Sequence, residues 1–472
     1  MNIVPPETQS LWRLIDFENS LSDRFIADAS RRILLNDLAS ATTLDVPLES
    51  LRGRSVMIST SRQLPTALAL ALLDGIVRQI VLCTPDLSPA GVASALAEAG
   101  VDTIISDGTG PTAGLVHQVQ VVGCSDRLRP TDADIERNIK TDWVLFTSGT
   151  TGHPKLVLHT NSSLTAAFGN GSGTPGHVIS RPVWSAFYDI RRYGGLQILL
   201  RALSSGGSMV FSDAQEPAAH FMQRAGREGV THLSGTPSHW RLALMSASTH
   251  SISPHYVRLG GEICDQAILD NLTAAFPSAG IIHGFASTET GVAFEVTDGL
   301  AGFPEAAIQD RSGSPQIRID GGSLRVRSSR TASHYLNSGL PSLRDDEGFI
   351  DTGDLVERRG NRYFFRGRKG GIINVGGLKV SPEFVETVIN QHPAVQVSRV
   401  SGRRNPITGA IVVAEIVTIP EGRLDPACFE RIRQEVFELC RSQLKAHEVP
   451  AMIRNVPRLD IGLSGKLERR PC

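Results

Sequence analysis

A run of small residues from 147 to 155 has the chemistry of an anion-binding loop. The segment follows the apolar run 143–146 and reads Thr147, Ser148, Gly149, Thr150, Thr151, Gly152, His153, Pro154, Lys155. Glycines reach positive φ without strain, so this backbone can approach a ligand closely. Clustered N–H and hydroxyl donors form a concavity for anions, and the lysine adds positive charge. The segment therefore predicts a loop that holds polyphosphate.

The spacing of this loop excludes a Walker A motif, which requires G-x-x-x-x-G-K-[ST]. Gly149 and Gly152 lie too close together, and Pro154 precedes Lys155. A P-loop kinase or ATPase is excluded on the same ground. The alternative is an ordinary surface loop rich in Ser, Thr and Gly, but the strand-like segments on both sides favour a phosphate loop.

The elements that must position this loop alternate between strand-like and helix-like patterns. Before the loop, strands are expected at 55–59, 79–83 and 102–105, with helices at 64–77 and 88–99. After it, helices are expected at 194–203, 217–228 and 267–276, and strands at 208–211, 232–234, 257–262 and 280–284. This alternation indicates βαβ units and a largely parallel sheet.

The pattern changes twice in the last third of the chain. Short strands separated by turn residues, expected at 316–320, 323–328, 349–351 and 362–365, predict a small β-rich subdomain. Beyond residue 371, a helix starting at 381–383, strands at 395–400 and 411–417 and a helix at 428–443 predict a compact α+β unit. The predicted fold class is α/β: a large N-terminal domain of parallel-rich sheets flanked by helices, with the β-rich subdomain, and a small α+β C-terminal domain.

Composition limits the class of protein. Apolar residues make up 41% and charged residues 20% of the 472, and the net charge is −1, as in ordinary soluble globular proteins rather than nucleic-acid-binding ones. We expect no signal peptide, and no membrane span because Asp74 and Arg78 interrupt the most apolar stretch. The six cysteines form no C-x-x-C pair and the 13 histidines no H-E-x-x-H motif, so we expect a reducing, cytoplasmic setting and no protein-built metal cage.

Four further segments could contribute polar groups to the same site. They are Gly284-Phe285-Ala286-Ser287-Thr288-Glu289, Asp351-Thr352-Gly353-Asp354, the stretch from Phe365 to Val380, and Ser464-Gly465-Lys466-Leu467-Glu468-Arg469. Each segment alone is weak evidence for a functional site, because Thr-Gly-Asp is a common turn and a Gly-Lys pair in a polar tail is usually solvated.

Taken together with the 147–155 loop and in this order, the segments resemble the adenylate-forming superfamily of acyl-CoA synthetases, peptide-synthetase adenylation domains and luciferases. The resemblance runs from about residue 55 to 470. It implies that a carboxylate attacks the α-phosphate of ATP, giving an acyl-adenylate and pyrophosphate, and that a thiol then displaces AMP. It also implies that the C-terminal domain is mobile, with an N-terminal domain at 1–367, a hinge at 368–371 and the C-terminal domain at 372–472.

The resemblance assigns roles to individual residues. For the nucleotide it implies that Thr147, Ser148, Gly149, Thr150, Thr151, Gly152 and Lys155 hold the phosphates, Phe285 stacks on adenine, Gly261 and Glu262 line the adenine site, and Asp354 and Arg368 contact the ribose. For catalysis it implies that Thr288 meets the α-phosphate, Glu289 holds Mg²⁺, and Lys466 bridges the substrate carboxylate and the α-phosphate. Donors and cations placed where charge develops lower the barrier electrostatically.

The acyl pocket is the least determined part. The segment 185–195 and Gly260 occupy the family's acyl-pocket positions, and the segment is unusually polar. Tyr188 lines the pocket in this interpretation. Asp189 could pair with an α-amino group, or Arg191 or Arg192 could hold an anionic acyl group, since guanidinium matches carboxylate geometry. The alternative is that both arginines face solvent. The spacing of 193–196 favours an aromatic or other small carboxylic acid.

Where the family usually has Tyr-Gly, this chain has Phe285-Ala286, and where it usually has Asp or Lys at the hinge, this chain has Gly370. A glycine hinge absorbs a large backbone change at least cost. Gly377 matches the glycine beside the family's pantetheine tunnel.

The acceptor stays open at this point. It could be coenzyme A, the phosphopantetheine of an acyl carrier protein, which would act in trans because no carrier domain follows Cys472, or an amine. A luciferase-like oxygenase would share the same motifs. A nucleotide-binding protein without catalysis would lack Lys466 or Glu289. Whether the chain is a monomer or a homodimer is not determined.

Overall fold

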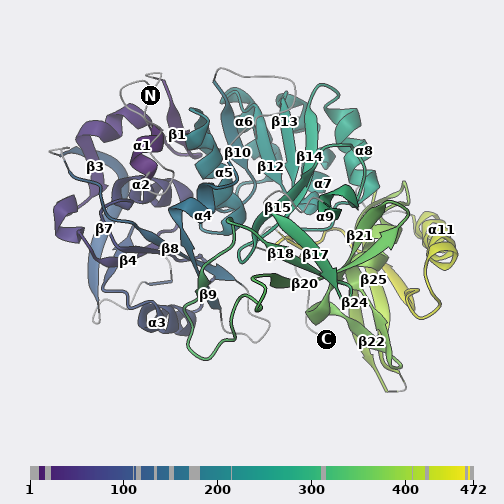
Figure 1. Cartoon of the computed structure of the whole chain (residues 1–472). Coiled ribbons are helices and arrows are strands. Elements are labelled where there is room, and N and C mark those ends of the chain that lie inside the picture. The colour runs from purple at the N-terminus through teal and green to yellow at the C-terminus, as the bar shows by residue number, and fades with distance from the viewer. Residues whose placement is uncertain are drawn as a thin grey trace.

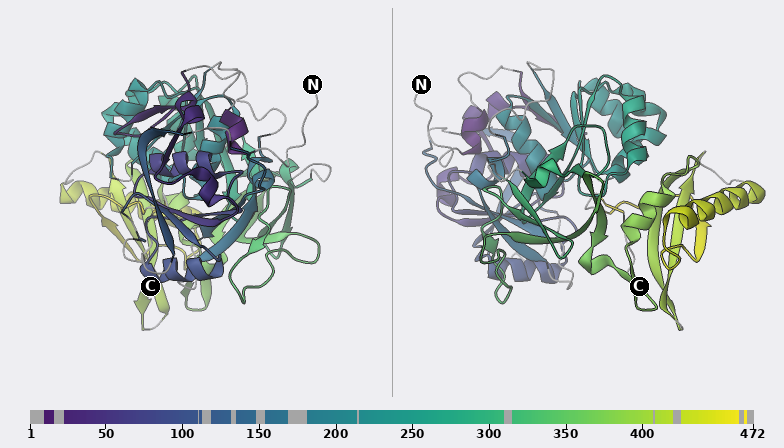
Figure 2. Two further views of the ribbon diagram at one scale, coloured as in Figure 1. Left: turned by 90° about the vertical axis from the view of Figure 1, so that its left-hand side faces the viewer. Right: turned by 45° about the vertical axis from the view of Figure 1, so that its right-hand side comes forward.

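The computed structural model describes residues 10–15, 23–109, 111–112, 119–131, 135–147, 154–168, 181–213, 215–309, 315–406, 408–419, 425–462 and 466–467. Within these ranges, two eight-stranded sheets and a five-stranded sheet form one large body, and a small α/β unit follows it (Figure 1). Seen from another side, this C-terminal unit projects from the large body as a separate lobe (Figure 2).

The first eight-stranded sheet brings the carboxyl ends of several strands to one edge. In spatial order its strands are β15 (Gly291–Val296), β14 (Gly280–Ser287), β13 (Tyr256–Leu259), β12 (His232–Gly235), β10 (Val183–Ala186), β11 (Ser208–Phe211), β1 (Phe25–Ala27) and β2 (Arg32–Leu34). From β14 to β1 all neighbours are parallel, and only the edge strands β15 and β2 are antiparallel. The segments that follow β10, β12, β13 and β14 therefore meet at one edge, where ligands bind in open α/β sheets.

The second eight-stranded sheet carries the ends of the expected phosphate loop. Its spatial order is β19 (His334–Tyr335), β9 (Lys155–Thr160), β8 (Asp142–Thr147), β5 (Gln79–Leu82), β4 (Ser55–Ser59), β6 (Thr103–Ser106), β7 (Gln120–Pro130) and β3 (Ala41–Leu44). β8 and β9 are antiparallel, and Thr147 pairs with Lys155. Residues 148–153 between them lie outside the described residues.

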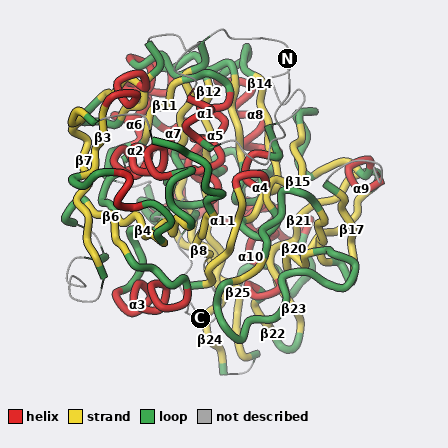
Figure 3. Tube along the Cα trace, turned by 60° about the vertical axis from the view of Figure 1, so that its left-hand side comes forward, coloured by secondary structure: helices red, strands yellow, loops and turns green. Residues whose placement is uncertain are grey.

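Apolar helices join the two large sheets into one core. One buried cluster contains residues of α2 (Gln63–Leu73), α5 (Tyr193–Ser204) and both sheets, so these helices lie between the sheets (Figure 3). Every residue of α2 is buried, as its Ala/Leu-rich sequence requires. A second cluster packs α6 (Ala218–Arg227), α7 (Pro237–Met245) and α8 (Gln266–Ala275) on the other face of the first sheet, and α3 (Pro89–Glu98) covers the second sheet. The other helices of this body are α1 (Leu11–Ile15), α4 (Asn161–Thr165) and α9 (Ala306–Gln309).

The remaining strands form the expected β-rich subdomain and the C-terminal unit. The subdomain sheet has the order β16 (Phe303–Pro304), β21 (Arg362–Arg368), β20 (Ile350–Arg359), β18 (Ser323–Arg327) and β17 (Gln316–Asp320). The C-terminal unit contains the hairpin β22 (Ile373–Val375) and β23 (Leu378–Val380), the sheet β24 (Val395–Asn405), β25 (Gly409–Thr418) and β26 (Met452–Asn455), and helices α10 (Pro382–Ile389) and α11 (Pro426–Gln443).

The predicted fold class is confirmed, and the differences lie mainly in antiparallel strands. β20 continues eight residues beyond the short strand expected at 349–351, because it pairs with β21 over that length. β7 was not predicted, since its sequence, QVVGCSDRLRP, lacks a regular apolar alternation and only pairing with β3 and β6 makes it a strand. Across the described residues, no helix is long and apolar enough to cross a membrane.

Candidate functional site

Lys466 reaches the edge of the first sheet from the C-terminal unit. The backbone N–H of its neighbour Leu467 donates to Oε1 of Glu262 at 3.0 Å, and Leu467 also forms an antiparallel bridge with Ile461. Cε of Lys466 lies 3.7 Å from the position that a Cβ would take at Gly261. The lysine arm is therefore held against the turn that follows β13.

Glu262 connects this arm to the large body. Its Oε2 accepts the backbone N–H of Ser238 at 2.9 Å, at the start of α7, where helix N–H groups favour negative charge. Gly261 has a φ of 83°, a conformation that glycine adopts without strain. The tight turn thus allows the two oxygens of one carboxylate to bind backbone groups from two parts of the chain.

Asp354 and Arg368 face each other on the β20–β21 pair beside the lysine. Arg368 Nε donates to Asp354 Oδ1 at 3.0 Å, while Asp354 Oδ2 is buried and has no hydrogen-bond partner among the described residues. Desolvation, and after it the charge of Arg368, lower the pKa of Lys466, although the carboxylates of Glu262 and Asp354 oppose this. A buried acceptor without a donor is costly, so the Asp354 oxygen fits a ligand that brings hydroxyl groups.

Phe285 lies in a stack of aromatic rings near the same edge. Its ring is stacked with Phe365 at 5.2 Å and with Phe294 at 6.0 Å between centroids. A β-bulge between Phe285 and Ala286 changes the register with β15 there. Bulges redirect side chains next to binding sites, and this one falls within the 284–289 segment.

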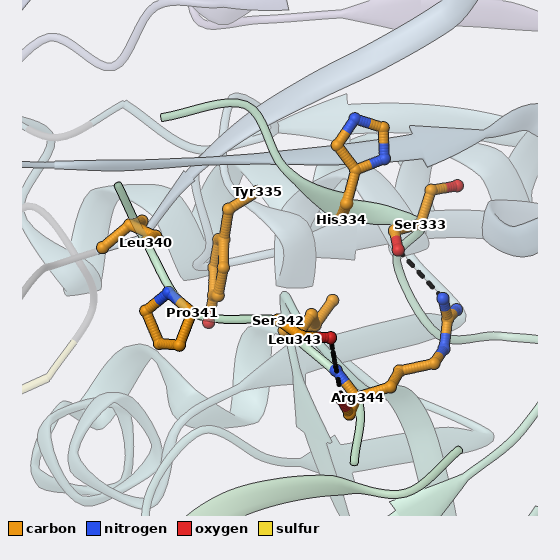
Figure 4. A pocket seen from close by; sticks show the side chains of 8 residues that line it. All are labelled: Ser333, His334, Tyr335, Leu340, Pro341, Ser342, Leu343 and Arg344. Atoms are coloured by element: carbon orange, nitrogen blue, oxygen red, sulfur yellow. Dashed lines mark hydrogen bonds between the residues drawn. The ribbon is translucent and has the colours of Figure 1, made fainter. Parts of the chain in front are cut away.

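Tyr335 connects the 284–289 segment to β9, the strand that follows the expected phosphate loop. Lys155 Nζ lies 5.1 Å from the centroid of the Tyr335 ring. Burial first, and then the carboxylate of Glu289, raise the pKa of Tyr335 to about 12. Tyr335 is also one wall of a surface pocket that runs to Leu340 and Arg344 (Figure 4). The structure therefore brings Lys155 and Glu289 to the same tyrosine, which sequence reasoning did not identify.

Thr288 is positioned through its backbone. Its carbonyl contacts His159 Nε2 at 2.6 Å, and His159 Nδ1 contacts the Ser163 hydroxyl at 2.9 Å. Burial lowers the pKa of His159 to about 4. A neutral histidine thus fixes the backbone at Thr288. Of the loop itself, Thr147 and Lys155 are described, whereas Ser148, Gly149, Thr150, Thr151 and Gly152 lie outside the described residues.

The expected acyl-pocket residues divide into two groups. Tyr188 donates its hydroxyl to the Gly260 carbonyl at 3.0 Å, so these two meet at the end of β13. Arg191 is 3% exposed, and binds both Asp189 oxygens and the Thr60 and Ser61 carbonyls. Arg192 pairs with Asp86 at 2.5 Å. Arg191 is therefore not on the surface, yet internal partners occupy both its guanidinium and Asp189.

The two expected glycines of the C-terminal region have different conformations. Gly370 lies in the single 3₁₀ turn Lys369–Gly371 and is not among the positive-φ glycines. Gly377 has a φ of 85° and with Gly376 makes the two-residue turn between β22 and β23. That turn requires positive φ at both residues. The turn therefore explains a glycine at position 377, which the sequence interpretation did not consider.

Arg258 is the second residue that sequence reasoning missed. It lies inside the buried strand β13, whose other residues, Tyr256, Val257 and Leu259, are apolar or aromatic. Its Nη1 lies 3.3 Å from the position of a Cβ at Gly260. A charged residue within a buried strand was the available signal, because such a group is almost always paired or functional.

Comparison with known proteins finds two family models that match this chain. Residues 56–336 match the model of the AMP-binding enzymes, and residues 384–466 match the model of their C-terminal domain. The sulfoacetate–CoA ligase of Cupriavidus necator is 27% identical over 414 residues, which are 83% of this chain and 77% of that protein. The 2-succinylbenzoate–CoA ligase of Escherichia coli is 32% identical over 262 residues, 53% of this chain and 52% of that protein. The chain thus spans between about half and three quarters of the length of these relatives.

Solved structures share the fold over nearly the whole chain. An anthranilate CoA ligase in complex with anthranoyl-AMP has a TM-score of 0.76 at 18% identity, covering 98% of this chain and 96% of that one. An amide bond synthetase from Marinactinospora thermotolerans has a TM-score of 0.73 at 19% identity, covering 97% of each chain. At these identities the likeness establishes the fold alone.

The Glu262 contact yields a first prediction. In Glu262→Ala the N–H of Leu467 loses its acceptor, and its hydrogen exchange should accelerate about 10- to 100-fold, since a bond to a charged group contributes about 1.5–3 kcal/mol. Exchange is measured by mass spectrometry on peptides that contain residues 466–467. Glu438→Ala, on the exposed face of α11, is the matched control. Unchanged protection in Glu262→Ala would contradict the proposed anchoring.

Proposed function

The chain belongs to the AMP-binding enzymes, and from this premise we propose that it activates a carboxylic acid with ATP and passes the acyl group to a thiol. Members of this family form adenylates, and the relatives described above include CoA ligases. In the proposed reaction a substrate carboxylate attacks the α-phosphate of ATP and pyrophosphate leaves. A thiol then attacks the acyl carbon and AMP leaves.

One observation carries the proposal: Lys466 of the C-terminal unit lies at the Gly261–Glu262 turn beside Asp354. A cation delivered to the nucleotide edge of an α/β sheet by a separate unit suits a reaction in which negative charge develops. The Lys466 ammonium would stabilise the oxygens of the attacking carboxylate and of the α-phosphate while the bond between them forms.

The other residues hold ATP in this proposal. The partnerless Asp354 oxygen would accept the ribose hydroxyls, and Arg368 would remain beside it. Phe285, already within an aromatic stack, would offer its ring to adenine. Thr147, Lys155 and residues 148–152 would hold the β- and γ-phosphates, and Thr288 the α-phosphate.

A magnesium ion would be held mainly by the nucleotide. Among the described residues no group of three or more His, Cys, Asp or Glu side chains could bind a metal. Mg²⁺ needs only one or two carboxylates when phosphates supply the other oxygens, and Glu289 is the carboxylate in the right segment. The ion would neutralise charge on the leaving pyrophosphate.

The acceptor is proposed as the thiol of CoA or of a carrier-protein phosphopantetheine, and Gly377 would line its path. For this step we propose a domain boundary with residues 1–367 on one side, 372–472 on the other and 368–371 as the hinge. Rotation about Gly370 would withdraw Lys466 after the adenylate forms. An amine acceptor is the second candidate, favoured by the shared fold with an amide bond synthetase.

Carboxylate-dependent exchange of labelled pyrophosphate into ATP tests the proposal. A panel of aromatic, short aliphatic and amino acids is followed by a panel of CoA, pantetheine and amines with the acid that reacts best. We expect exchange with one acid class and AMP release that depends on a thiol. Absence of exchange with every acid would contradict adenylation, and turnover with amines alone would favour the second candidate.

Lys466→Ala should separate the two half-reactions. Pyrophosphate exchange should fall about 100- to 1,000-fold, the usual loss for one stabilising group, whereas transfer from a preformed acyl-adenylate to the thiol should change little. Both rates are measured by single-turnover kinetics, with the exposed Lys445→Ala as control. Equal loss of both half-reactions would refute the assignment of Lys466.

The same lysine predicts a pH dependence. Because desolvation, and then the charge of Arg368, lower the pKa of Lys466, the ammonium should deprotonate below the value of about 10.4 for free lysine. Rising pH removes the useful charge, so kcat/KM for ATP should decline on the alkaline side. In Lys466→Arg the rate should be lower and this alkaline decline absent. An identical decline in both proteins would assign it to another group.

Gly370→Pro should impair the second half-reaction selectively. The 3₁₀ turn seen here is compatible with the proline φ of about −65°, so adenylate formation should stay within about threefold. The rotated state requires a different backbone conformation, so thioester formation should fall at least about tenfold. Gly370→Ala, which keeps most backbone freedom, is the control. Normal thioester formation in Gly370→Pro would disprove a hinge at this residue.

A further inference from the structure

A buried cluster of charged side chains lies beneath the Gly260–Gly261 turn. Arg258 of β13 and Arg201 of α5 both donate to Oε1 of Glu295 on β15, each at 3.1 Å. Arg201 and Arg258 are each 7% exposed. Against desolvation, the charge of Arg330, after those of Arg258 and Arg201, also lowers the pKa of Glu295, and Arg330 donates to the Val292 carbonyl. Three arginines thus share one acid, and among the described residues none of the three pairs with a second carboxylate.

The Arg258 guanidinium faces the expected acyl pocket. Its Nη1 lies 3.3 Å from the position of a Cβ at Gly260, and its Nη2 lies 3.4 Å from that at Gly284. The Tyr188 hydroxyl is 3.7 Å from the same Gly260 position. A side chain at residue 260 would crowd the guanidinium, so Gly260 leaves it room. At residue 284 the Phe294 carbonyl, 2.6 Å from the Cβ position, already requires glycine.

Two hydroxyl side chains lie on the same face of the sheet as this guanidinium. The Ser234 hydroxyl is buried without a hydrogen-bond partner in the described structure, whereas the side chains of Arg258 and Tyr256 interact with each other. Ser234 is the register partner of Arg258 on the parallel strand β12, and Tyr256 lies two residues before Arg258, so all three share one face of the sheet. Buried positive charge that exceeds the buried negative charge is costly, and an anion beside Arg258 would balance the excess of arginines over Glu295.

The reacting end lies close by. Lys466 contacts the Gly261 side of the turn and Arg258 the Gly260 side, and consecutive Cα atoms are about 3.8 Å apart. We propose that this site selects acids with a second anionic group, a carboxylate or sulfonate, a few carbon atoms from the carboxylate that is activated, and that Arg258 binds this second group. The proposal rests on the proposed function and names its substrate class. As the anion-binding residue it names Arg258 in place of Arg191, which is bound by Asp189 and by the Thr60 and Ser61 carbonyls. Arg258 also takes the place of Arg192, which pairs with the exposed Asp86.

Matched pairs of acids test this selection in the full chain. Pyrophosphate exchange is measured with glutarate against valerate, adipate against hexanoate, terephthalate against 4-methylbenzoate, and 3-sulfopropionate against butyrate. We expect at least one diacid to exceed its matched monoacid about 100-fold in kcat/KM, the scale of losing a hydrogen bond to a charged group.

Variants at Arg258 must remove that preference. Arg258→Met should lower kcat/KM for the preferred diacid about 100-fold and leave the monoacid within about threefold, and Arg258→Lys should restore part of the loss because it keeps the charge. Arg201→Met, which also breaks a contact to Glu295 but does not face Gly260, is the matched control and should leave the preference for the diacid unchanged. If Arg258→Met does not fold, the double variant Arg258→Met/Glu295→Gln removes both charges and provides the same comparison.

The outcomes separate the two proposals. Exchange with monoacids at rates equal to or above those of every diacid would overturn the anion site and leave adenylation intact. The anion site would also be overturned if Arg258→Met preferred the diacid over its matched monoacid as strongly as the parent protein does. Exchange with no acid of either kind would contradict adenylation and the anion site together.

Discussion

The carboxylate of Glu262 is the contact on which the candidate site depends. One oxygen accepts the N–H of Ser238 at the start of α7, and the other accepts the N–H of Leu467 from the C-terminal unit. Two lobes that have separate hydrophobic cores are thereby connected, alongside contacts such as Arg241 to the Gln396 carbonyl and Arg366 to Glu448. Because Lys466 precedes Leu467, this contact also decides where the lysine charge lies. The geometry of the reacting centre is therefore a property of the docked lobe.

This way of positioning a charge has an energetic consequence. Desolvation of Lys466 against the Gly261 turn is costly and lowers its pKa. Carboxylates of Glu262 and Asp354 offset part of that cost. The contact consists of few hydrogen bonds, so it can open without unfolding either lobe. In the proposed reaction that opening would give the thiol access.

The interior of the first sheet shows a second arrangement of charge. Arg258 and Arg201 converge on Glu295, and Gly260 leaves space beside Arg258. Burying unequal numbers of cations and anions is unfavourable unless a ligand or water restores the balance. The two sides of one turn thus each have a positively charged side chain, Lys466 on the Gly261 side and Arg258 on the Gly260 side. This separation would allow the two ends of one substrate to be recognised independently.

The sequence by itself determined the fold class, most of the parallel strands, the family and the segments that carry chemistry, because apolar periodicity and short motifs are local properties. It predicted Lys466, Glu262 and Asp354 as site residues, and the structure brings these three together. Only the tertiary structure placed Tyr335 between Lys155 and Glu289, assigned partners to Arg191 and Arg192, and showed Arg258 beneath Gly260. Those facts depend on side chains from distant strands and helices packing against one another. The linear spacing of residues contains no information on which arginine has its partners inside the protein and which one faces the pocket.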